Sequence, residues 1–215
     1  MGVPVRNTDN MTPDFTSSAP LHIAGAGGLG RETLDALFAC GRKPHELVFV
    51  DDHPAVAELH GVPVRRPEDV RGGWYVVAIA DPVARRNLSR RMTGLGCAPM
   101  TVVHPRATLA HDVTGLEGCI VLANAFVSTG VRLGTHTQVQ YNATVGHDAV
   151  LHDFVTILPG ANIAGSTTLH SDVTVGSNAA VLQGLLVGPK TFVGAGAVVT
   201  KNHPAGSVLV GVPAR

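Results

Sequence analysis

The chain has 215 residues, 16 basic and 16 acidic side chains, 25 glycines and only nine aromatic residues. Its balanced charge excludes a global positive field of the kind that binds nucleic acid or an anionic membrane. A hydrophobic content of 45% is too high for a disordered chain, and no apolar run reaches the roughly 18 residues that would predict a membrane span. This aliphatic, glycine-rich and aromatic-poor composition indicates a regular, repetitive architecture.

The first residues and the cysteines indicate a cytoplasmic protein. Residues 1–20 contain no basic start followed by an apolar stretch, so they do not look like a secretory signal and are predicted to be a disordered leader. Cys40, Cys97 and Cys119 are too few and too scattered for a disulfide framework.

Residues 21–104 are predicted to form a small Rossmann-like α/β domain. Short apolar runs alternate with segments of helical periodicity, an order typical of a parallel sheet with right-handed crossovers. The predicted strands are 21–24, 47–50 and 74–80, and the predicted helices are 31–40 and 83–92.

A glycine-rich loop follows the first predicted strand. Gly25, Gly27 and Gly30 match the pattern G-x-G-x-x-G, and Gly28 and Leu29 lie within it. Between a strand and a helix, such a loop places backbone N–H groups and a helix N-terminus against a phosphate. The loop is therefore predicted to be a nucleotide site.

The type of nucleotide stays open at this point. Asp51 follows the second predicted strand, 21 residues after Gly30, where an acid can bond a ribose hydroxyl, and Asp52 comes next. A nucleotide-linked substrate and NAD both fit this pattern. NAD is the weaker hypothesis, because the segment has about half the length of a doubly wound dinucleotide domain and no hydride-transfer domain follows it. A third interpretation is a glycine turn that packs the helix on the strand without any ligand.

The second half of the chain repeats every six residues. Fifteen of the sixteen positions reached by steps of six from Leu109 to Val199 are Leu, Ile or Val, with Gly115 the exception. The positions two residues earlier, from Ala107 to Ala197, are mostly Ala, Val or Thr, and Cys119 falls among them. One bulky and one small inward residue per hexad predict a narrow parallel coil with three flat faces, about 4.8 Å between turns and about five turns in all. Glycine often follows the aliphatic position, and this is interpreted as a need to turn there. These glycines are Gly134, Gly146, Gly176, Gly188 and Gly194.

The hexad pattern resembles the hexapeptide-repeat acyltransferases over about residues 105–211, which implies a left-handed parallel β-helix. Val198–Asn202 and Gly211–Arg215 look like the final coil and C-terminal signature of that family. A glycine-rich α/β unit before the β-helix is similar to one branch, the bacterial sugar acyltransferases that act on UDP-linked 4-amino sugars or on sialic acid. The resemblance thus implies a nucleotide-sugar-binding domain at 21–104 and an acyltransferase domain at 105–215.

The branch has a catalytic histidine in a sequence like G-H-D-x-x-I-G-D-F, and here the matching segment runs from Gly146 to Phe154. His147 lies two residues past the inward Val145, so the period turns it outward. A histidine titrates near neutral pH, which suits a general base, and Asp148 is a candidate to orient it. Four other histidines lack this match and are predicted to be surface residues, namely His111, His136, His152 and His170. No metal site is expected, because the histidines show no ligand spacing with acids or thiols.

The resemblance also implies the other parts of the site. The backbone N–H of Gly165 would stabilise the oxyanion, and Gly194, Ala195 and Lys201 would contact acetyl-CoA in a groove between adjacent subunits, because family members are trimers. Gly25, Gly27, Gly28, Leu29 and Gly30, together with Asp51 and Asp52, would hold the nucleotide of the sugar. Two positions depart from the branch, where the glycine loop often has histidine in place of Leu29, and a second histidine often stands at Thr156.

The expected function is the transfer of acetyl from acetyl-CoA to the amino group of a nucleotide-linked amino sugar. Transfer to a hydroxyl, or of a longer acyl group, is the alternative within enzymes. A β-helix assembly that senses a nucleotide without catalysis is the alternative from another class.

Overall fold

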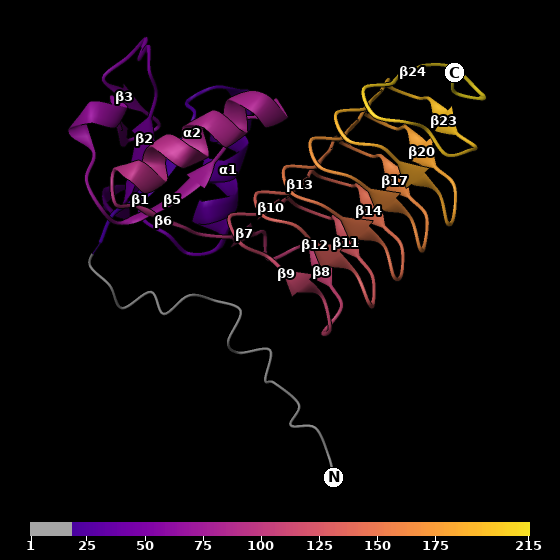
Figure 1. Ribbon diagram of the computed structural model, residues 1–215. Coiled ribbons are helices and arrows are strands. Elements are labelled where there is room, and N and C mark those ends of the chain that lie inside the picture. The colour runs from indigo at the N-terminus through magenta and orange to yellow at the C-terminus, as the bar shows by residue number, and fades with distance from the viewer. Residues whose placement is uncertain (1–18) are drawn as a thin grey trace.

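The computed structural model describes residues 19–215, so the expected leader at 1–20 lies almost entirely outside the described residues. The chain forms a small α/β domain followed by a left-handed parallel β-helix, and the C-terminus lies at the end of the helix that is remote from the α/β domain (Figure 1). The predicted fold class is confirmed.

The α/β domain is built on one six-stranded sheet with the order β3-β4-β2-β1-β5-β6, parallel except for β3. Three of the strands match the predicted ones, although the third ends at Val77 and not at residue 80. The others were missed because proline interrupts two of them and the third is very short. The strands are β1 Leu21–Ala24, β2 Leu47–Val50, β3 Glu58–Leu59, β4 Val62–Arg65, β5 Trp74–Val77 and β6 Ala98–Pro99.

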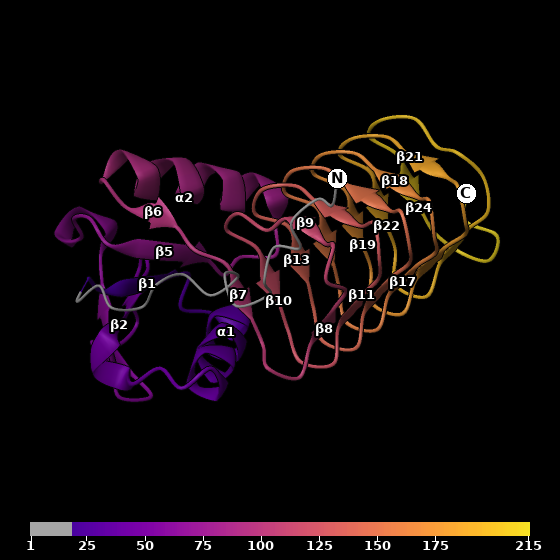
Figure 2. The ribbon, with the colours of Figure 1, turned by 90° about the horizontal axis from the view of Figure 1, so that it is seen from below.

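Two helices cover opposite faces of this sheet (Figure 2). Helix α1, Gly28–Ala39, packs on the side of Ile23 and Phe49, and α2, Pro82–Gly94, packs on the side of Tyr75. Successive side chains of a strand point to opposite faces of the sheet, so alternate residues pack against α1 and against α2. Helix α1 starts three residues before its predicted start, so the last glycines of the loop form its first turn. Short 3-10 turns lie at Pro44–Glu46 and Pro67–Asp69.

The β-helix has three faces of parallel strands, which the chain visits in a fixed order. Equivalent residues are 18 apart, except in the last coil, where Phe192 pairs with Val208. The first face contains β7 Val102–Val103, β10 Ile120–Val121, β13 Gln138–Val139, β16 Thr156–Ile157, β19 Thr174–Val175, β22 Phe192–Val193 and β24 Val208–Leu209. The second contains β8 Thr108–Leu109, β11 Phe126–Val127, β14 Thr144–Val145, β17 Asn162–Ile163, β20 Ala180–Val181 and β23 Val198–Val199. The third contains β9 Thr114–Gly115, β12 Arg132–Leu133, β15 Val150–Leu151, β18 Thr168–Leu169 and β21 Leu186–Val187. The first face, with seven strands, extends the coil beyond the five turns expected.

The two hexad columns form the core of the coil. Every aliphatic position from Val121 to Val199 is buried, and Cys119 is fully buried in the small column, as predicted. The glycines that follow the aliphatic column need a different explanation from turning, because none of them has a left-handed φ. A Cβ on Gly134 would lie 2.4 Å from the carbonyl carbon of His152, and one on Gly146 would lie 2.5 Å from the amide of Gly165. Glycine is needed there because successive coils stack closely.

The α/β domain lies against the early strands of the first face, as β7, β10 and β13 show in Figures 1 and 2. Ile120, Gln138 and Thr156 point outward from that face, yet all three are buried, because the α/β domain covers them. Farther along the same face, Phe192 and Val208 are exposed. Among the described residues, no helix is long and apolar enough to span a bilayer.

Candidate active site

His147 lies at the corner where the chain passes from the second face to the third, directly after β14. We call this the second-to-third corner. It is the one corner of the coil that does not border the first face. The residues at equivalent positions in successive coils are His111, Thr129, His147, Gly165, Gln183 and Lys201.

The imidazole of His147 is held by its neighbour in sequence. Nδ1 lies 2.8 Å from Oδ2 of Asp148, and the two side chains are 52% and 65% exposed. Asp148 has a left-handed φ of 58°, and its N–H donates to the carbonyl of Thr129 in the preceding coil at 2.9 Å. When Nδ1–H donates to the carboxylate, Nε2 carries the free lone pair and can accept a proton. The pair therefore has the arrangement of a general base with an orienting acid.

Gly165 lies directly beneath the ring of His147, one coil farther along. A Cβ built on Gly165 would be 2.5 Å from Nε2 and 2.7 Å from Cε1 of His147, so only glycine leaves the ring in place. The next amide, Ser166 N–H, donates to the His147 carbonyl at 2.7 Å. The N–H of Gly165 has no acceptor within residues 19–215. An unused backbone donor thus lies close to the nitrogen that would take the proton.

The other predicted acyl-CoA contacts separate into two places. Lys201 occupies the same corner as His147, three coils away, and is exposed. Gly194 and Ala195 follow β22 and lie at the corner between the first and second faces. One chain therefore does not bring these two residues to His147.

The remaining histidines differ in their surroundings. His136 is buried and not a surface residue, which corrects the prediction, because helix α2 covers it. Its ring lies between those of Tyr75 and Phe154, with Nε2 2.8 Å from the hydroxyl of Ser89. Burial, and next the charge of Arg85, lower the pKa of His136 to about 4. His152 and His170 stack on each other on the third face with ring centroids 4.8 Å apart, and His111 is exposed.

The glycine loop has two parts with different roles. Gly25 has a left-handed φ of 109°, and a Cβ on Gly30 would lie 2.1 Å from the Gly25 carbonyl oxygen, so both glycines are needed for the turn and for close packing of α1. Gly27 and Gly28 are exposed, and no atom lies within 4 Å of the position that a Cβ would take on either residue. The helix N-terminus therefore opens to solvent with free N–H groups, where an anion is favoured. Leu29 is half-buried against the core.

Asp51 organises this loop. Its Oδ2 accepts from the Ala26 N–H at 3.0 Å and its Oδ1 accepts from the His53 N–H at 2.9 Å. Both carboxylate oxygens keep further lone pairs for a ligand. Asp52 points to α2 and pairs with Arg91, which also reaches Glu68 at 3.4 Å. The two acids predicted to act together thus have different partners.

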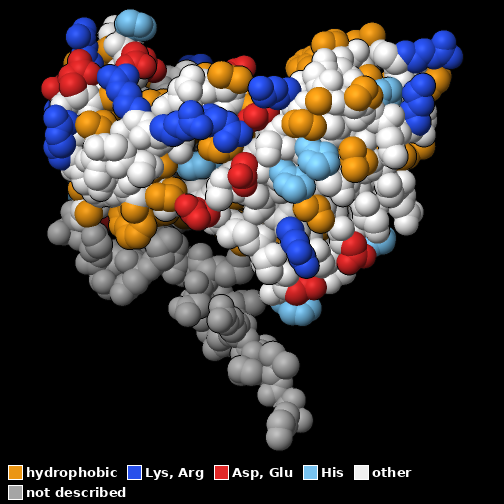
Figure 3. All heavy atoms as spheres, in the orientation of Figure 1, with side chains coloured by type: hydrophobic (Ala, Val, Ile, Leu, Met, Phe, Trp, Pro, Cys, Tyr) orange, Lys and Arg blue, Asp and Glu red, His pale blue; other side chains and the backbone are white. Residues whose placement is uncertain are grey.

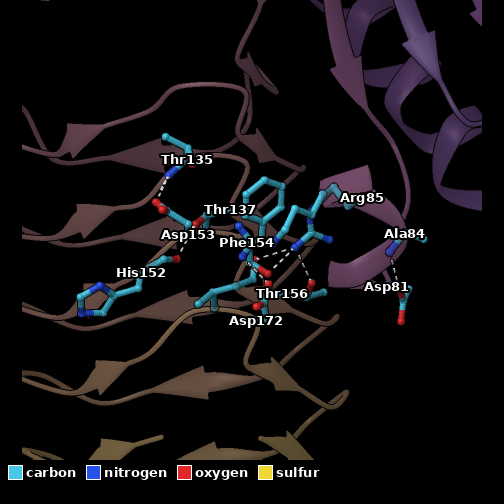
Figure 4. A network of polar contacts seen from close by, with 12 residues as sticks. Asp81, Ala84, Arg85, Thr135, Thr137, His152, Asp153, Phe154, Thr156 and Asp172 are labelled. Atoms are coloured by element: carbon cyan, nitrogen blue, oxygen red, sulfur yellow. Dashed lines mark hydrogen bonds and ion pairs between the residues drawn. The ribbon is translucent and has the colours of Figure 1, made fainter. Parts of the chain in front are cut away.

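The residues that join the domains were not predicted from the sequence. Arg85 on α2 is 1% exposed and bonds to carbonyls of the α/β domain. It also bonds to the carbonyls and hydroxyl of Phe154–Thr156 (Figure 4). Thr156, where the branch often has histidine, is buried in this network. Nothing in the sequence distinguishes Arg85 from the other arginines of the same helix.

The surface around these sites carries mixed charge. On the face in Figure 3, basic and acidic side chains are interspersed, with no extended field of one sign. Among residues 19–215, no three His, Cys, Asp or Glu side chains are grouped so that they could hold a metal ion.

Comparison with known proteins gives a consistent result over nearly the whole chain. Residues 20–92 match the family model described as the PglD N-terminal domain. The chain is 34% identical to GDP-perosamine N-acetyltransferase of Escherichia coli O157:H7 over 90% of its own length and 94% of the relative's.

Two solved structures are similar over the same extent. One is a histidine-to-asparagine mutant of perosamine N-acetyltransferase from Caulobacter crescentus with CoA and GDP-perosamine (28% identity, TM-score 0.84, 91% of this chain and 95% of that chain). The other is the acetyltransferase domain of PglB from Neisseria gonorrhoeae FA1090 with acetyl coenzyme A (32% identity, TM-score 0.84, 92% and 98%).

Proposed function

Since the chain belongs to the hexapeptide-repeat sugar N-acetyltransferases that carry a PglD-type N-terminal domain, we propose that it transfers acetyl from acetyl-CoA to the amino group of a nucleotide-linked amino sugar. His147 is the general base, and the enzyme works in the cytoplasm as a homotrimer. The observation that carries the proposal is the position of His147 between Asp148 and Gly165.

The reaction is a direct acyl transfer. The neutral amine attacks the thioester carbonyl carbon, and Nε2 of His147 takes the proton that the nitrogen loses as the C–N bond forms. The negative charge on the carbonyl oxygen is stabilised by the N–H of Gly165. Collapse of the tetrahedral intermediate breaks the C–S bond and releases the CoA thiolate, to which the imidazolium returns a proton. Asp148 stabilises the imidazolium in between.

The glycine loop holds the diphosphate of the sugar nucleotide at the N-terminus of α1. Gly27 and Gly28 support this part, because their surroundings are open and their N–H groups lie at the positive end of a helix. Asp51 keeps the loop in shape and offers its remaining lone pairs to the ribose. The GDP-perosamine bound by one similar structure makes GDP-sugars the first substrates to try.

The positions of the two parts support the proposed trimer. The α/β domain covers the first face, and His147 lies at the second-to-third corner, the corner that does not touch that face. A sugar nucleotide on the loop of one subunit reaches the His147 corner of its neighbour in a closed three-subunit ring. Gly194, Ala195 and Lys201 belong to the same proposal as contacts of acetyl-CoA between subunits.

Replacing His147 with alanine tests the assigned base. CoA release with an amino-sugar nucleotide should fall by about 10²-fold or more, while thermal stability and oligomeric mass stay unchanged. His111→Ala, at the exposed equivalent position two coils before His147, is the matched control and should keep full activity. Unchanged turnover by His147→Ala would exclude this base.

A thermal-shift screen over GDP-, UDP- and dTDP-sugars, acetyl-CoA and NAD tests the ligands independently of the reaction. Stabilisation by a sugar nucleotide and by acetyl-CoA is expected. Stabilisation by NAD alone would refute the proposed substrate, and stabilisation by a sugar nucleotide without any acetyl-CoA effect would favour a non-catalytic nucleotide sensor.

A further inference from the structure

The guanidinium of Arg85 connects two segments that are far apart in sequence. Figure 4 shows its bonds to the segment in the β-helix. Nη1 donates to the carbonyls of Ile79 at 2.8 Å and Ala80 at 2.9 Å, in the loop after β5. Nη2 donates to the Phe154 carbonyl at 2.6 Å and to the Thr156 hydroxyl at 2.9 Å, in the β-helix. Although burial lowers its pKa to about 10, the side chain remains a cation at neutral pH.

No carboxylate among the described residues pairs with this buried cation. Its acceptors are backbone carbonyls and one hydroxyl, all of which are neutral. Asp172 and Asp81 act on its charge only from beyond ion-pair distance. Burying a charge without a carboxylate in contact is unfavourable for stability, so the residue is better explained by the geometry that it imposes than by the energy that it adds.

The segment that Arg85 holds in the β-helix is the middle of one particular coil. That coil begins at His147, passes through Phe154–Thr156 on the first face and ends at Gly165, 18 residues after it started. The base and the predicted oxyanion donor are therefore the two ends of the same turn of chain that carries the acceptors of Arg85.

The segment that Arg85 holds in the α/β domain lies against the glycine loop. A Cβ on Gly25 would be 2.9 Å from the Ala78 carbonyl oxygen and 3.0 Å from Cγ1 of Ile79, so the two loops are in close contact. Gln138 also donates to the Ile79 carbonyl at 3.2 Å, and the Thr156 hydroxyl donates to the Ala80 carbonyl at 2.9 Å. The loop after β5 cannot shift without breaking several of these bonds.

We propose that Arg85 is a positioning residue, which fixes the glycine loop at the height of the coil that carries His147 and Gly165. The inference rests on the proposed function for the nature of the substrate. Height here means position along the axis of the β-helix. In a ring whose symmetry axis is parallel to that axis, equivalent coils of all subunits lie at the same height. A loop fixed at the height of its own catalytic coil is then also at the height of the neighbour's, so the bound sugar meets the neighbour's His147.

Three variants separate positioning from general stability. Thr156→Val removes one acceptor of Arg85 with little change in side-chain volume. Arg85→Lys keeps the positive charge but removes the guanidinium group, whose two NH2 groups bond to the two segments. Arg86→Met is the matched control. Arg86 lies in the same interface, with a 2.6 Å ion pair to Asp172 and its guanidinium 4.0 Å from the centre of the Phe154 ring, but it has no bond to the loop after β5.

We expect kcat/KM for the amino-sugar nucleotide to fall about tenfold in Thr156→Val and about a hundredfold in Arg85→Lys, since displacements near 1 Å have such effects. The KM for acetyl-CoA and the slow acetylation of a free amino sugar without nucleotide should change less than twofold. Arg86→Met should leave all these values within twofold, although it lowers the melting temperature. An equal loss for the free sugar and the sugar nucleotide, or a loss in Arg86→Met as large as in Arg85→Lys, would overturn the proposal.

Amide hydrogen exchange gives a second readout that does not depend on the reaction. Peptides covering residues 25–30 and 78–81 should exchange faster in Thr156→Val and Arg85→Lys than in wild type and Arg86→Met, with no change over 162–175. Unchanged exchange at 25–30 would refute the positioning role. If wild type acetylates no amino-sugar nucleotide, the proposed function fails, and the exchange data still decide whether Arg85 fixes the loop.

Discussion

Replacing Gly165 with alanine is expected to reduce acetyl transfer about a hundredfold without unfolding the protein. The added Cβ would lie 2.5 Å from Nε2, 2.7 Å from Cε1 and 2.9 Å from Cδ2 of His147. Ordinary contacts between such atoms are about 3.5 Å or longer, so the ring must retreat by about 1 Å. A base displaced by that distance loses about a factor of 100, or about 2.7 kcal/mol of transition-state stabilisation.

The same change should have little effect on folding. The His147 side chain is half-exposed and can turn into solvent. Gly165 has no left-handed φ, so alanine fits its backbone, and the loss of unfolded-chain freedom favours the folded state by about 0.4–1 kcal/mol. The free energy of unfolding is therefore expected within about 1 kcal/mol of wild type.

Initial rates of CoA thiol release, measured at saturating and at limiting amino-sugar nucleotide, would give kcat and KM, and urea unfolding would give the stability. His111→Ala serves again as the control at this corner. Wild-type rates in Gly165→Ala would refute the packing of His147 on Gly165. A loss of activity accompanied by an equal loss of folded protein would refute the argument that only the ring moves.

Three further changes test single contacts. His136 has a pKa of about 4 in the folded protein, below its unfolded value of about 6.5. Its contribution to the free energy of unfolding is therefore complete above pH 6.5 and is lost as the pH falls towards 4, by about 3 kcal/mol in all. His136→Gln should flatten this part of the pH profile of urea unfolding, and a profile identical to that of wild type would contradict the prediction. Gly30→Ala places a Cβ 2.1 Å from the Gly25 carbonyl oxygen, which should destabilise by about 1–3 kcal/mol, and an unchanged melting temperature would disprove the close packing. Asp148→Asn should lower kcat about tenfold with no change in melting temperature, since the exposed pair orients the ring and contributes little to folding; full activity would remove Asp148 from the mechanism.

The β-helix could be predicted from sequence because its core is specified locally. Each hexad repeats the same inward pair, so Val145, Leu151 and Ile157 identify the coil without any knowledge of distant contacts. His147 could be placed for the same reason, since its distance from the inward Val145 determines that it points out. Local spacing also predicted the glycine loop, the strand before it and the helix after it.

The interface between the domains could not be predicted, because the period does not say which face of the coil is covered. Thr144 and Thr156 hold the same place in their hexads, yet Thr156 is fully buried under the α/β domain and Thr144 is partly exposed. His136 was expected at the surface for this reason, although a helix from the other domain covers it. Arg85 gave no signal, because its acceptors in the β-helix lie about 70 residues away in sequence.

A mixing experiment tests whether the site is shared between subunits. His147→Ala lacks the base, and Gly28→Glu should block the phosphate position without strain, because no atom lies within 4 Å of the added Cβ and the backbone is not left-handed. Each variant alone should be inactive.

If the loop and His147 of one chain formed a site, trimers assembled from both variants would stay inactive. If each site joins the loop of one subunit to the His147 of the next, about a quarter of the sites in an equal, randomly assembled mixture combine two intact parts. Denaturing and refolding the variants together should thus restore about 25% of wild-type activity, whereas mixing the folded trimers should restore none. Recovery near zero after co-refolding to mixed trimers, confirmed by mass, would exclude a site between subunits.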